Sequence, residues 1–212
     1  MLGNLKREVL EAAVAAEISG LCVHGTGNFS AIDRESGLVA ITPSGLARES
    51  LTLEDVPLLD LRGGLAEPGK RGKPSSESRM HIEAYLRRKD VAAVAHTHSP
   101  YATALAVLGR TIEPVTFEAV FYGIDVAVVG LFRPGTEELA KAAAEALDGS
   151  DVCLLKNHGA LVVGASVEET LLKAKHLESV ARTYYLALTL GGDAARPIPR
   201  EELERYGQIP SS

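Results

Sequence analysis

The spacing of hydrophobic positions changes repeatedly along the chain, and these changes predict helices and strands in alternation. Over residues 5–19 apolar side chains recur every three to four positions, which is the period of an amphipathic helix, and Gly20 follows as a stop. Ser75 and Ser76 offer hydroxyl caps for a second helix that ends near residue 89. The same period predicts further helices over residues 101–108, 136–147 and 167–190.

Short apolar runs bounded by turn residues predict the strands. Residues 28–33 and 38–41 are two such runs joined by a polar turn, which is typical of a β-hairpin. Further strands are predicted over residues 56–61, 91–95, 125–130, 152–155 and 160–163. Residues 62–73 contain four glycines and a proline, and this composition predicts a mobile loop.

The length and overall composition fit one domain over residues 1–212. The chain has 212 residues, of which 46% are hydrophobic and 24% charged, so it can bury a substantial core. Neither a fixed-period repeat nor a low-complexity linker divides it. Beyond the last predicted helix, residues 193–212 contain three prolines and are predicted to form a mobile tail.

The charge and cysteine content exclude several classes of protein. A formal net charge of −6 without any basic block leaves no footprint for DNA or RNA. No stretch reaches the roughly 18 consecutive apolar residues of a membrane span. The two cysteines are too few for a disulfide framework. These features predict a cytoplasmic protein.

Three histidines form a pattern typical of a catalytic metal site. His96 and His98 are spaced i and i+2 at the end of a predicted strand, so their side chains point to the same face and can bind one ion. His158 lies in an Asn-His-Gly turn and supplies a third imidazole. Three protein ligands leave a coordination position open for substrate, which distinguishes a catalytic zinc site from a structural one. The pattern therefore indicates a metal-dependent enzyme.

The histidine pattern does not select one metal. Imidazole ligands suit zinc, while manganese, cobalt and iron remain alternatives because geometry and availability also govern selection. The other histidines, His24, His81 and His176, are predicted to be hydrogen-bonded structural groups.

Small and hydroxyl-bearing residues in three loops predict an anion site. Ser44 and Gly45 lie in one turn, Ser75 and Ser76 precede a helix, and Asn28 follows a glycine-rich segment. Backbone N–H groups, hydroxyls and a helix N-terminus are the usual phosphate ligands. A phosphorylated substrate is therefore expected.

The ordered motifs of the chain resemble the class II aldolase and adducin family. They are Gly27-Asn28-Phe29-Ser30, Thr42-Pro43-Ser44-Gly45, Pro74-Ser75-Ser76-Glu77, His96-Thr97-His98-Ser99-Pro100-Tyr101-Ala102 and Asn157-His158-Gly159. The resemblance extends over nearly the whole chain. It implies a three-layer α/β/α domain around a central, largely antiparallel sheet, and a cyclic homotetramer with active sites between subunits.

The resemblance also implies roles for individual residues. The metal ligands would be His96, His98 and His158, with Glu77 both touching the metal at rest and serving as the proton-transfer base. The substrate phosphate would be bound by Asn28, Ser44, Gly45, Ser75 and Ser76. A carboxylate beside a divalent cation can exchange a metal contact for a proton, which agrees with the role given to Glu77.

The expected reaction is a zinc-dependent, reversible aldol cleavage of a ketose 1-phosphate to dihydroxyacetone phosphate and an aldehyde. L-Fuculose-1-phosphate aldolases and L-ribulose-5-phosphate 4-epimerases are the members that the motifs resemble most. Glu77 favours the aldolases, because epimerases carry aspartate there. Three alternatives are kept: a 4-epimerase, an enzyme like methylthioribulose-1-phosphate dehydratase, and a non-catalytic adducin-like interaction domain.

The chain departs from the family pattern at the second proton donor. Fuculose-phosphate aldolases have a tyrosine where this sequence has Phe117, which has no proton to give. Three residues could replace it: Glu118, Tyr122 and Tyr206. Glu118 and Tyr206 are the predicted catalytic residues, the latter because the segment around it resembles the family's active-site-closing carboxyl end.

Overall fold

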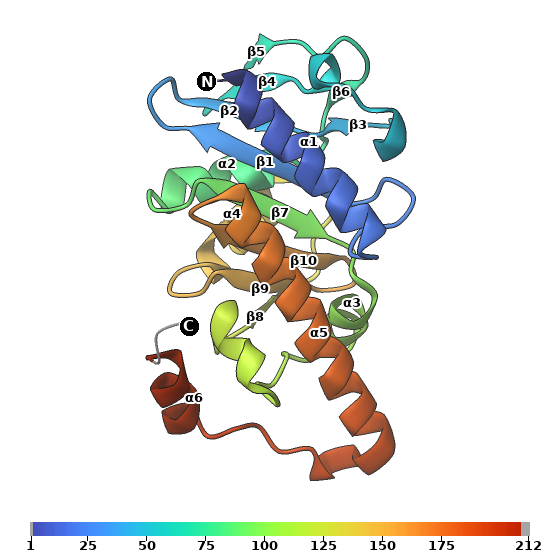
Figure 1. The fold of residues 1–212 in the computed structure, drawn as a ribbon, viewed down its shortest axis with the longest axis vertical. Helices are drawn as coiled ribbons and strands as arrows, with labels where there is room; N and C mark the ends of the chain where they lie inside the picture. The colour runs from blue at the N-terminus through green and yellow to red at the C-terminus, as the bar shows by residue number, and fades with distance from the viewer. Residues whose placement is uncertain (1, 209–212) are drawn as a thin grey trace.

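A computed structural model describes residues 2–208 of the chain, and its centre is an eight-stranded sheet in the order β5-β4-β2-β1-β7-β10-β9-β8 (Figure 1). All neighbours in this sheet pair antiparallel except β8 and β9. A second, two-stranded sheet pairs β3 with β6. The strands are β1 (Asn28–Asp33), β2 (Leu38–Ile41), β3 (Pro43–Ser44), β4 (Leu58–Asp60), β5 (Leu65–Glu67), β6 (Lys73–Pro74), β7 (Ala93–Thr97), β8 (Ala127–Val129), β9 (Val152–Leu155) and β10 (Gly159–Gly164).

Helices cover both faces of the sheet. They are α1 (Leu2–Ile18), α2 (Ser78–Arg87), α3 (Pro100–Val107), α4 (Glu137–Ala146), α5 (Val167–Gly191) and α6 (Arg200–Gly207), with short 3-10 turns η1 (Arg48–Ser50), η2 (Leu53–Asp55), η3 (Phe117–Phe121) and η4 (Gly192–Ala194). None of the helices between residues 2 and 208 is long and apolar enough to cross a membrane.

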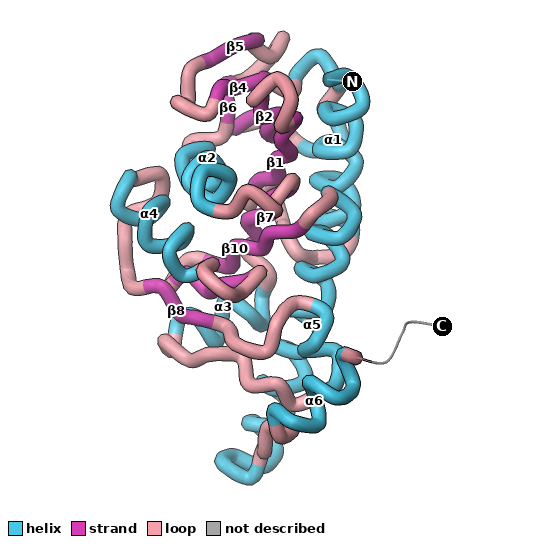
Figure 2. The backbone as a smooth tube through the Cα atoms, turned by 90° about the vertical axis from the view of Figure 1, so that its left-hand side faces the viewer, coloured by secondary structure: helices cyan, strands magenta, loops and turns pink. Residues whose placement is uncertain are grey.

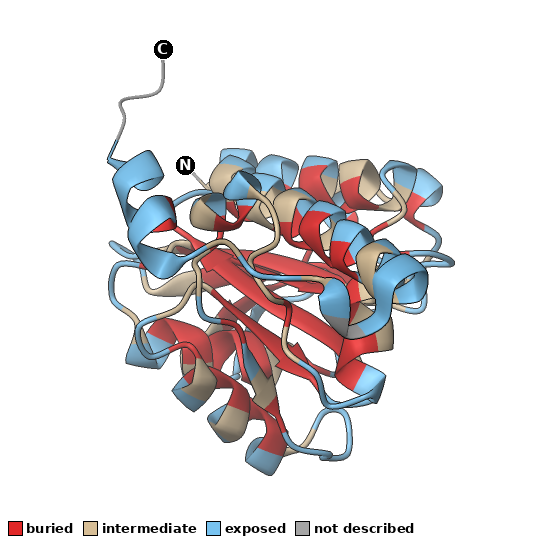
Figure 3. Ribbon diagram, turned by 90° about the horizontal axis from the view of Figure 1, so that it is seen from below, coloured by how far each residue is buried: buried red, intermediate tan, exposed pale blue. Residues whose placement is uncertain are grey.

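The two faces of the sheet bury separate hydrophobic clusters. One cluster lies under α1, α3 and α5, and the other lies under α2 and α4 (Figure 2). Successive residues of a strand point to opposite faces, so Ala93 and Ala95 of β7 join the first cluster and Val94 joins the second. The inner strands β7, β9 and β10 between the helices are wholly buried (Figure 3). The expected three-layer, largely antiparallel α/β/α fold is confirmed.

Several elements differ from the sequence expectation. The bounds predicted for β1, β2 and β9 match those observed. Residues 62–73, predicted as a mobile loop, contain β5 and the first residue of β6, so they are not a loop throughout. Every residue of β5 is exposed, so no hydrophobic alternation marks this edge strand. The tail contains α6, which is anchored by buried Leu203. Residues 209–212 of the predicted tail lie outside the described residues, and its mobility stays a prediction.

Two glycines allow neighbouring backbone to approach the central strand β7 closely. A Cβ atom at Gly159 would lie 2.1 Å from the carbonyl oxygen of Thr97, and one at Gly27 would lie 2.5 Å from that of His96. Gly27 also has a φ of 71°, a left-handed conformation that favours glycine. Glycine at these positions therefore lets β10 and the glycine-rich loop lie directly against the segment that carries His96 and His98.

We expect Gly159→Ala to destabilise the protein by about 1–3 kcal/mol, the usual cost of overpacking a core, because β10 must move away from β7. Thermal unfolding measures the effect. Gly3→Ala is the matched control, since a Cβ at Gly3 has no neighbour within 4 Å and the substitution lies in α1. Equal unfolding midpoints for Gly159→Ala and the unsubstituted protein would contradict this account of the β7–β10 contact.

Candidate active site

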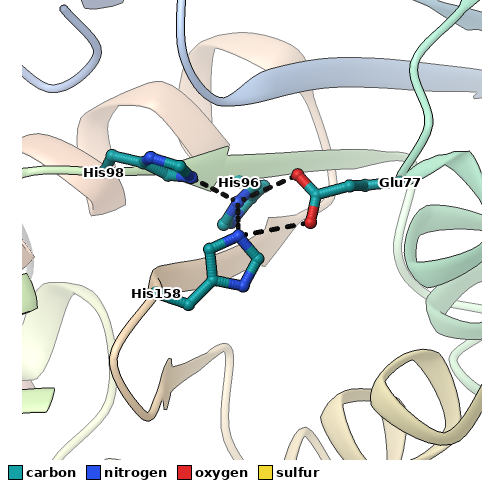
Figure 4. Close-up of side chains that lie close together, drawn as sticks. All are labelled: Glu77, His96, His98 and His158. Carbon is teal, nitrogen blue, oxygen red and sulfur yellow. Dashed lines mark hydrogen bonds and ion pairs between the residues drawn. The ribbon is translucent and has the colours of Figure 1, made fainter. Parts of the chain in front are cut away.

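Four side chains converge at the carboxyl end of β7 (Figure 4). The Nε2 atom of His96 lies 2.9 Å from Nε2 of His98 and 3.2 Å from Nε2 of His158. The Glu77 carboxylate faces both ring systems, with Oε2 3.3 Å from His96 and Oε1 3.3 Å from His158. One ligand atom from each residue lies within 4.8 Å of every other. The three histidines and the glutamate predicted as ligands are thus brought together.

Three segments of the chain place the four candidate ligands. His96 lies inside β7, His98 follows its end, and Glu77 directly precedes α2. His158 reaches the group because Asn157 adopts a φ of 58°, a left-handed conformation that asparagine tolerates, while the His158 N–H donates to Leu155. The antiparallel pairing of β10 with β7 then holds this turn beside His96.

The protonation of the histidines suits a metal. Nδ1 of His96 donates to the carbonyl oxygen of Ala160 at 2.9 Å, so Nε2 is left with its lone pair, as is usual for metal-bound histidine. Burial lowers the pKa of His98 to about 4 and also lowers the pKa of His158. The imidazole rings and the carboxylate therefore face one another within reach of a single ion. The group fits a divalent metal.

The Glu77 carboxylate is subject to opposing influences. Burial raises its pKa, but the hydrogen bond and electrostatic interaction with His96 outweigh burial and, with smaller contributions from His158 and Asn28, lower it to about 2. A divalent cation at the same place acts in the same direction. Glu77 is thus an anion at rest, and movement away from these neighbours leaves burial to make it a stronger base.

The residues predicted to bind phosphate lie beside Glu77. Pairing of β3 with β6 brings the two serine loops together: the Ser76 N–H donates to Ser44 Oγ at 3.2 Å, and the Glu77 N–H donates to Ser75 Oγ at 3.3 Å. Gly45 and Ser76 are exposed, and Ser44 is half-buried. The N-terminus of α2 follows directly, so serine hydroxyls and the positive end of a helix lie next to the candidate metal ligands.

Asn28 is already engaged inside the protein. Its Nδ2 donates to Glu77 Oε2 at 3.0 Å, and its Oδ1 accepts from His81 Nε2 at 2.5 Å. One amide N–H is left beyond these two contacts. The sequence predicted a phosphate contact for Asn28 but not this link to Glu77. It did predict that His81 is hydrogen-bonded.

Arg48 is a second group that sequence reasoning missed. Only 4% of Arg48 is exposed, and its guanidinium donates to the carbonyl oxygens of Thr26 and Gly27 at 3.1 and 2.6 Å. The Cζ atom of the guanidinium also lies over the Phe29 ring, 5.7 Å from the ring centre. The buried cation therefore fixes the glycine-rich loop that leads into Asn28. Nothing in the local pattern distinguishes this arginine from one on the surface.

The predicted second proton donors lie outside the group of metal ligands. Glu118 belongs to η3, and Tyr206 belongs to α6. The centre of the Tyr206 ring lies 4.9 Å from that of the Phe117 ring. Both side chains are largely exposed, and these elements lie at the β8 end of the molecule (Figure 1). Tyr122 is buried, and its hydroxyl has no hydrogen-bond partner within residues 2–208. None of these three residues belongs to the group of Glu77 and the three histidines.

Comparison with protein families identifies the fold. A model of the class II aldolase and adducin N-terminal domain matches residues 7–185. The chain belongs to the class II aldolase and adducin family. Among its relatives in this family is the 5-deoxy-D-ribulose 1-phosphate aldolase of Bacillus thuringiensis serovar kurstaki, 38% identical over 98% of this chain and 96% of the relative.

Other members of the class II aldolase and adducin family are also similar to this chain. The L-fuculose phosphate aldolase of Methanococcus maripaludis is 38% identical over 77% of this chain and 87% of its own length. A solved L-fuculose 1-phosphate aldolase superposes with a TM-score of 0.91 at 33% identity, covering 97% of this chain and 95% of the other. The resemblance inferred from the motifs is therefore confirmed.

We expect the purified protein to hold about one equivalent of divalent metal per chain, and His98→Ala to reduce it strongly, because a three-histidine site needs each imidazole. His24→Asn, at an exposed histidine, is the control. The pKa of free imidazole is about 6.5, whereas the pKa of His98 is about 4. Because protons then compete with the metal for His98 only at lower pH, the metal should stay bound well below about pH 6.5. Metal analysis after dialysis at a series of pH values measures this. Equal metal content in His98→Ala and the unsubstituted protein would rule out the site.

Proposed function

We propose that the protein catalyses the reversible, metal-dependent aldol cleavage of a ketose 1-phosphate to dihydroxyacetone phosphate and an aldehyde. The observation that carries this proposal is the convergence of His96, His98, His158 and Glu77 beside the serine loops that precede α2. A divalent cation next to an anion site is what cleavage of a phosphorylated ketose requires. The names of the relatives support an aldolase.

The names of three relatives support a particular class of substrate. They are aldolases for 5-deoxy-D-ribulose 1-phosphate, for L-fuculose phosphate and, in Rhodospirillum rubrum, for 5-methylthioribulose 1-phosphate and 5-deoxyribulose 1-phosphate. In each sugar the carbon furthest from the phosphate carries no hydroxyl group. The aromatic pair of Phe117 and Tyr206 suits such an apolar end. We infer a ketose 1-phosphate of the L-fuculose type, deoxygenated at its far end.

The serine loops and Asn28 would hold the phosphate. Hydroxyls of Ser44, Ser75 and Ser76 and the N–H of Gly45 are available there, and the first turn of α2 adds its positive end. The remaining N–H of Asn28 completes the set. These contacts fix the substrate so that its reacting carbons lie beside Glu77.

Glu77 would transfer the proton at C3 of the substrate. In the cleavage direction the C4 hydroxyl loses a proton, the C3–C4 bond breaks, and C3 receives a proton to give dihydroxyacetone phosphate. When bound, a divalent ion, zinc with manganese or cobalt as alternatives, supplies a Lewis acid for the negative charge that develops on substrate oxygens. Because burial raises the pKa of Glu77, the carboxylate becomes a stronger base once it turns from His96 toward C3.

A partner subunit would supply the second proton-transfer group. Glu118 and Tyr206 are our candidates for the C4 hydroxyl, and in a single chain they lie apart from Glu77. We therefore propose a homotetramer in which these residues of one subunit face the metal ligands of the next. Cytoplasmic localisation is proposed as well, supported by Cys22 and Cys153, which are both free and buried.

We expect the protein to release dihydroxyacetone phosphate from L-fuculose 1-phosphate or 5-deoxyribulose 1-phosphate, detected by coupled reduction with glycerol-phosphate dehydrogenase. Glu77→Gln should lower kcat about 10²- to 10⁴-fold, the usual contribution of a positioned base. Glu54→Gln, at an exposed glutamate, is the control and should leave kcat unchanged.

Two results would overturn the proposal. Conversion of L-ribulose 5-phosphate to D-xylulose 5-phosphate without any triose phosphate would identify a 4-epimerase. Absence of metal together with absence of any reaction on these sugars would favour the adducin-like interaction domain.

A further inference from the structure

A row of buried polar side chains leads from Glu77 into the protein between β1 and α2. Asn28 and Ser30 are spaced i and i+2 on β1, so they share a face of the sheet. His81 and Tyr85 follow Glu77 at intervals of four residues, so they share a face of α2. None of the four side chains behind Glu77 is more than 5% exposed. The site already described uses only the first of them.

Continuous hydrogen bonds link this row. Asn28 Nδ2 donates to Glu77 Oε2 at 3.0 Å, and the other end of the Asn28 amide lies 2.5 Å from His81 Nε2. The opposite nitrogen of the same ring, Nδ1, lies 2.7 Å from Ser30 Oγ, and Ser30 Oγ lies 2.7 Å from the Tyr85 hydroxyl. Each buried polar group thereby has a partner, as a network in a region of low dielectric requires.

The direction of every hydrogen bond in the row follows from Glu77. The ionised carboxylate can only accept, so Asn28 turns its NH₂ group to Glu77 and its carbonyl oxygen to His81. His81 Nε2 must then carry a proton. Burial lowers the pKa of His81 to about 3, so the ring is neutral and its Nδ1 accepts from Ser30, which in turn accepts from Tyr85. All the donors point toward Glu77.

We propose that His81 is a positioning residue for Glu77, which it controls through the orientation of the Asn28 amide. The Nε2–H of His81 holds the Asn28 carbonyl oxygen and keeps the amide NH₂ directed at the carboxylate. Reversal of the amide would set a carbonyl oxygen against the Glu77 anion. The inference rests on the proposed role of Glu77 in moving the C3 proton, because the position of the carboxylate then sets the rate of that step.

The neighbours of His81 in the fold support a positioning role over contact with substrate. The residue is fully buried, and Asn28 stands between it and Glu77. Its substitution should therefore reduce the rate of proton transfer while leaving the phosphate loops intact. Hydrogen-bonded groups behind a functional carboxylate or metal ligand typically contribute about 10- to 100-fold to activity or metal affinity.

The test compares His81→Leu, His81→Gln and Ala84→Gly. Proton transfer alone is measured by NMR as exchange of the C3 proton of dihydroxyacetone phosphate with D₂O, which needs no aldehyde. We expect His81→Leu to lower the exchange kcat about 10- to 100-fold, with a smaller effect on KM because Asn28 supplies only one of the proposed phosphate contacts. His81→Gln should recover most of the rate, because its amide N–H can replace Nε2–H. Ala84→Gly weakens α2 by about 1 kcal/mol and should keep the exchange rate of the unsubstituted protein.

Two further readouts separate positioning from a loss of folding. Co²⁺ affinity reports whether Glu77 and the histidines keep their arrangement, and thermal unfolding reports the stability of each variant. A rate that falls with stability across all three variants, or a rate in His81→Leu within twofold of the unsubstituted protein, would overturn the inference.

The tautomer of His81 gives a test that needs no activity. Long-range ¹⁵N–¹H spectra of protein labelled at histidine should show His81 neutral and protonated at Nε2 at neutral pH. A proton on Nδ1, or a charged ring, would overturn the proposed direction of the hydrogen bonds. An unsubstituted protein that neither cleaves ketose phosphates nor exchanges the C3 proton, yet shows the Nε2–H tautomer, would refute the proposed reaction and with it the rate effect of His81, while the hydrogen-bond direction stands.

Discussion

The structure depends on one electrostatic constraint: three imidazole rings and a carboxylate face one another at the carboxyl end of β7. A divalent cation is a shared partner that suits all four of these groups. β7 carries His96 and leads into His98, its neighbour β10 fixes the turn of His158, and α2 begins at Glu77. The sheet order places these segments side by side although they lie far apart in sequence.

Groups outside the cluster divide two tasks between them. Ala160 and Asn28 fix ligand orientation, the first through Nδ1 of His96 and the second through the Glu77 carboxylate. Arg48 and the β3–β6 pair instead shape the loops next to the cluster, where serine hydroxyls collect. This arrangement separates the groups that could hold a metal from those that would hold an anion, and Glu77 lies at the boundary between them. In the proposed reaction, a ligand at that boundary would move a proton without releasing the remaining three.

The sequence predicted those parts of the fold and the site that depend on local patterns. Alternating or continuous apolar runs located β1, β2 and β9, and the i, i+2 spacing located His96 and His98. The edge strand β5 was missed because its residues are exposed and its pairing with β4 is a tertiary contact. α6 was missed because a proline-rich composition outweighed its one buried leucine.

The hydrogen bonds behind the site could not be predicted from local sequence patterns either, because they too depend on tertiary contacts. Ser30 and His81 have the spacings that align them with Asn28 and Glu77, but nothing in the sequence states that β1 packs against α2. The buried position of Arg48 likewise depends on where η1 meets the glycine-rich loop. The resemblance to the class II aldolase and adducin family located the ligands, and the structure added the groups that orient them.

The most direct test of the central claim is a metal titration of the reaction. Protein stripped of metal with a chelator would be titrated with Zn²⁺, Mn²⁺ or Co²⁺ while the release of dihydroxyacetone phosphate from L-fuculose 1-phosphate and from 5-deoxyribulose 1-phosphate is followed. The metal-free protein should have no activity. With at least one of these metals and sugars, activity should rise in proportion to added metal and saturate at about one equivalent per chain, as expected for a single catalytic site. Full cleavage activity in the metal-free protein would contradict the account.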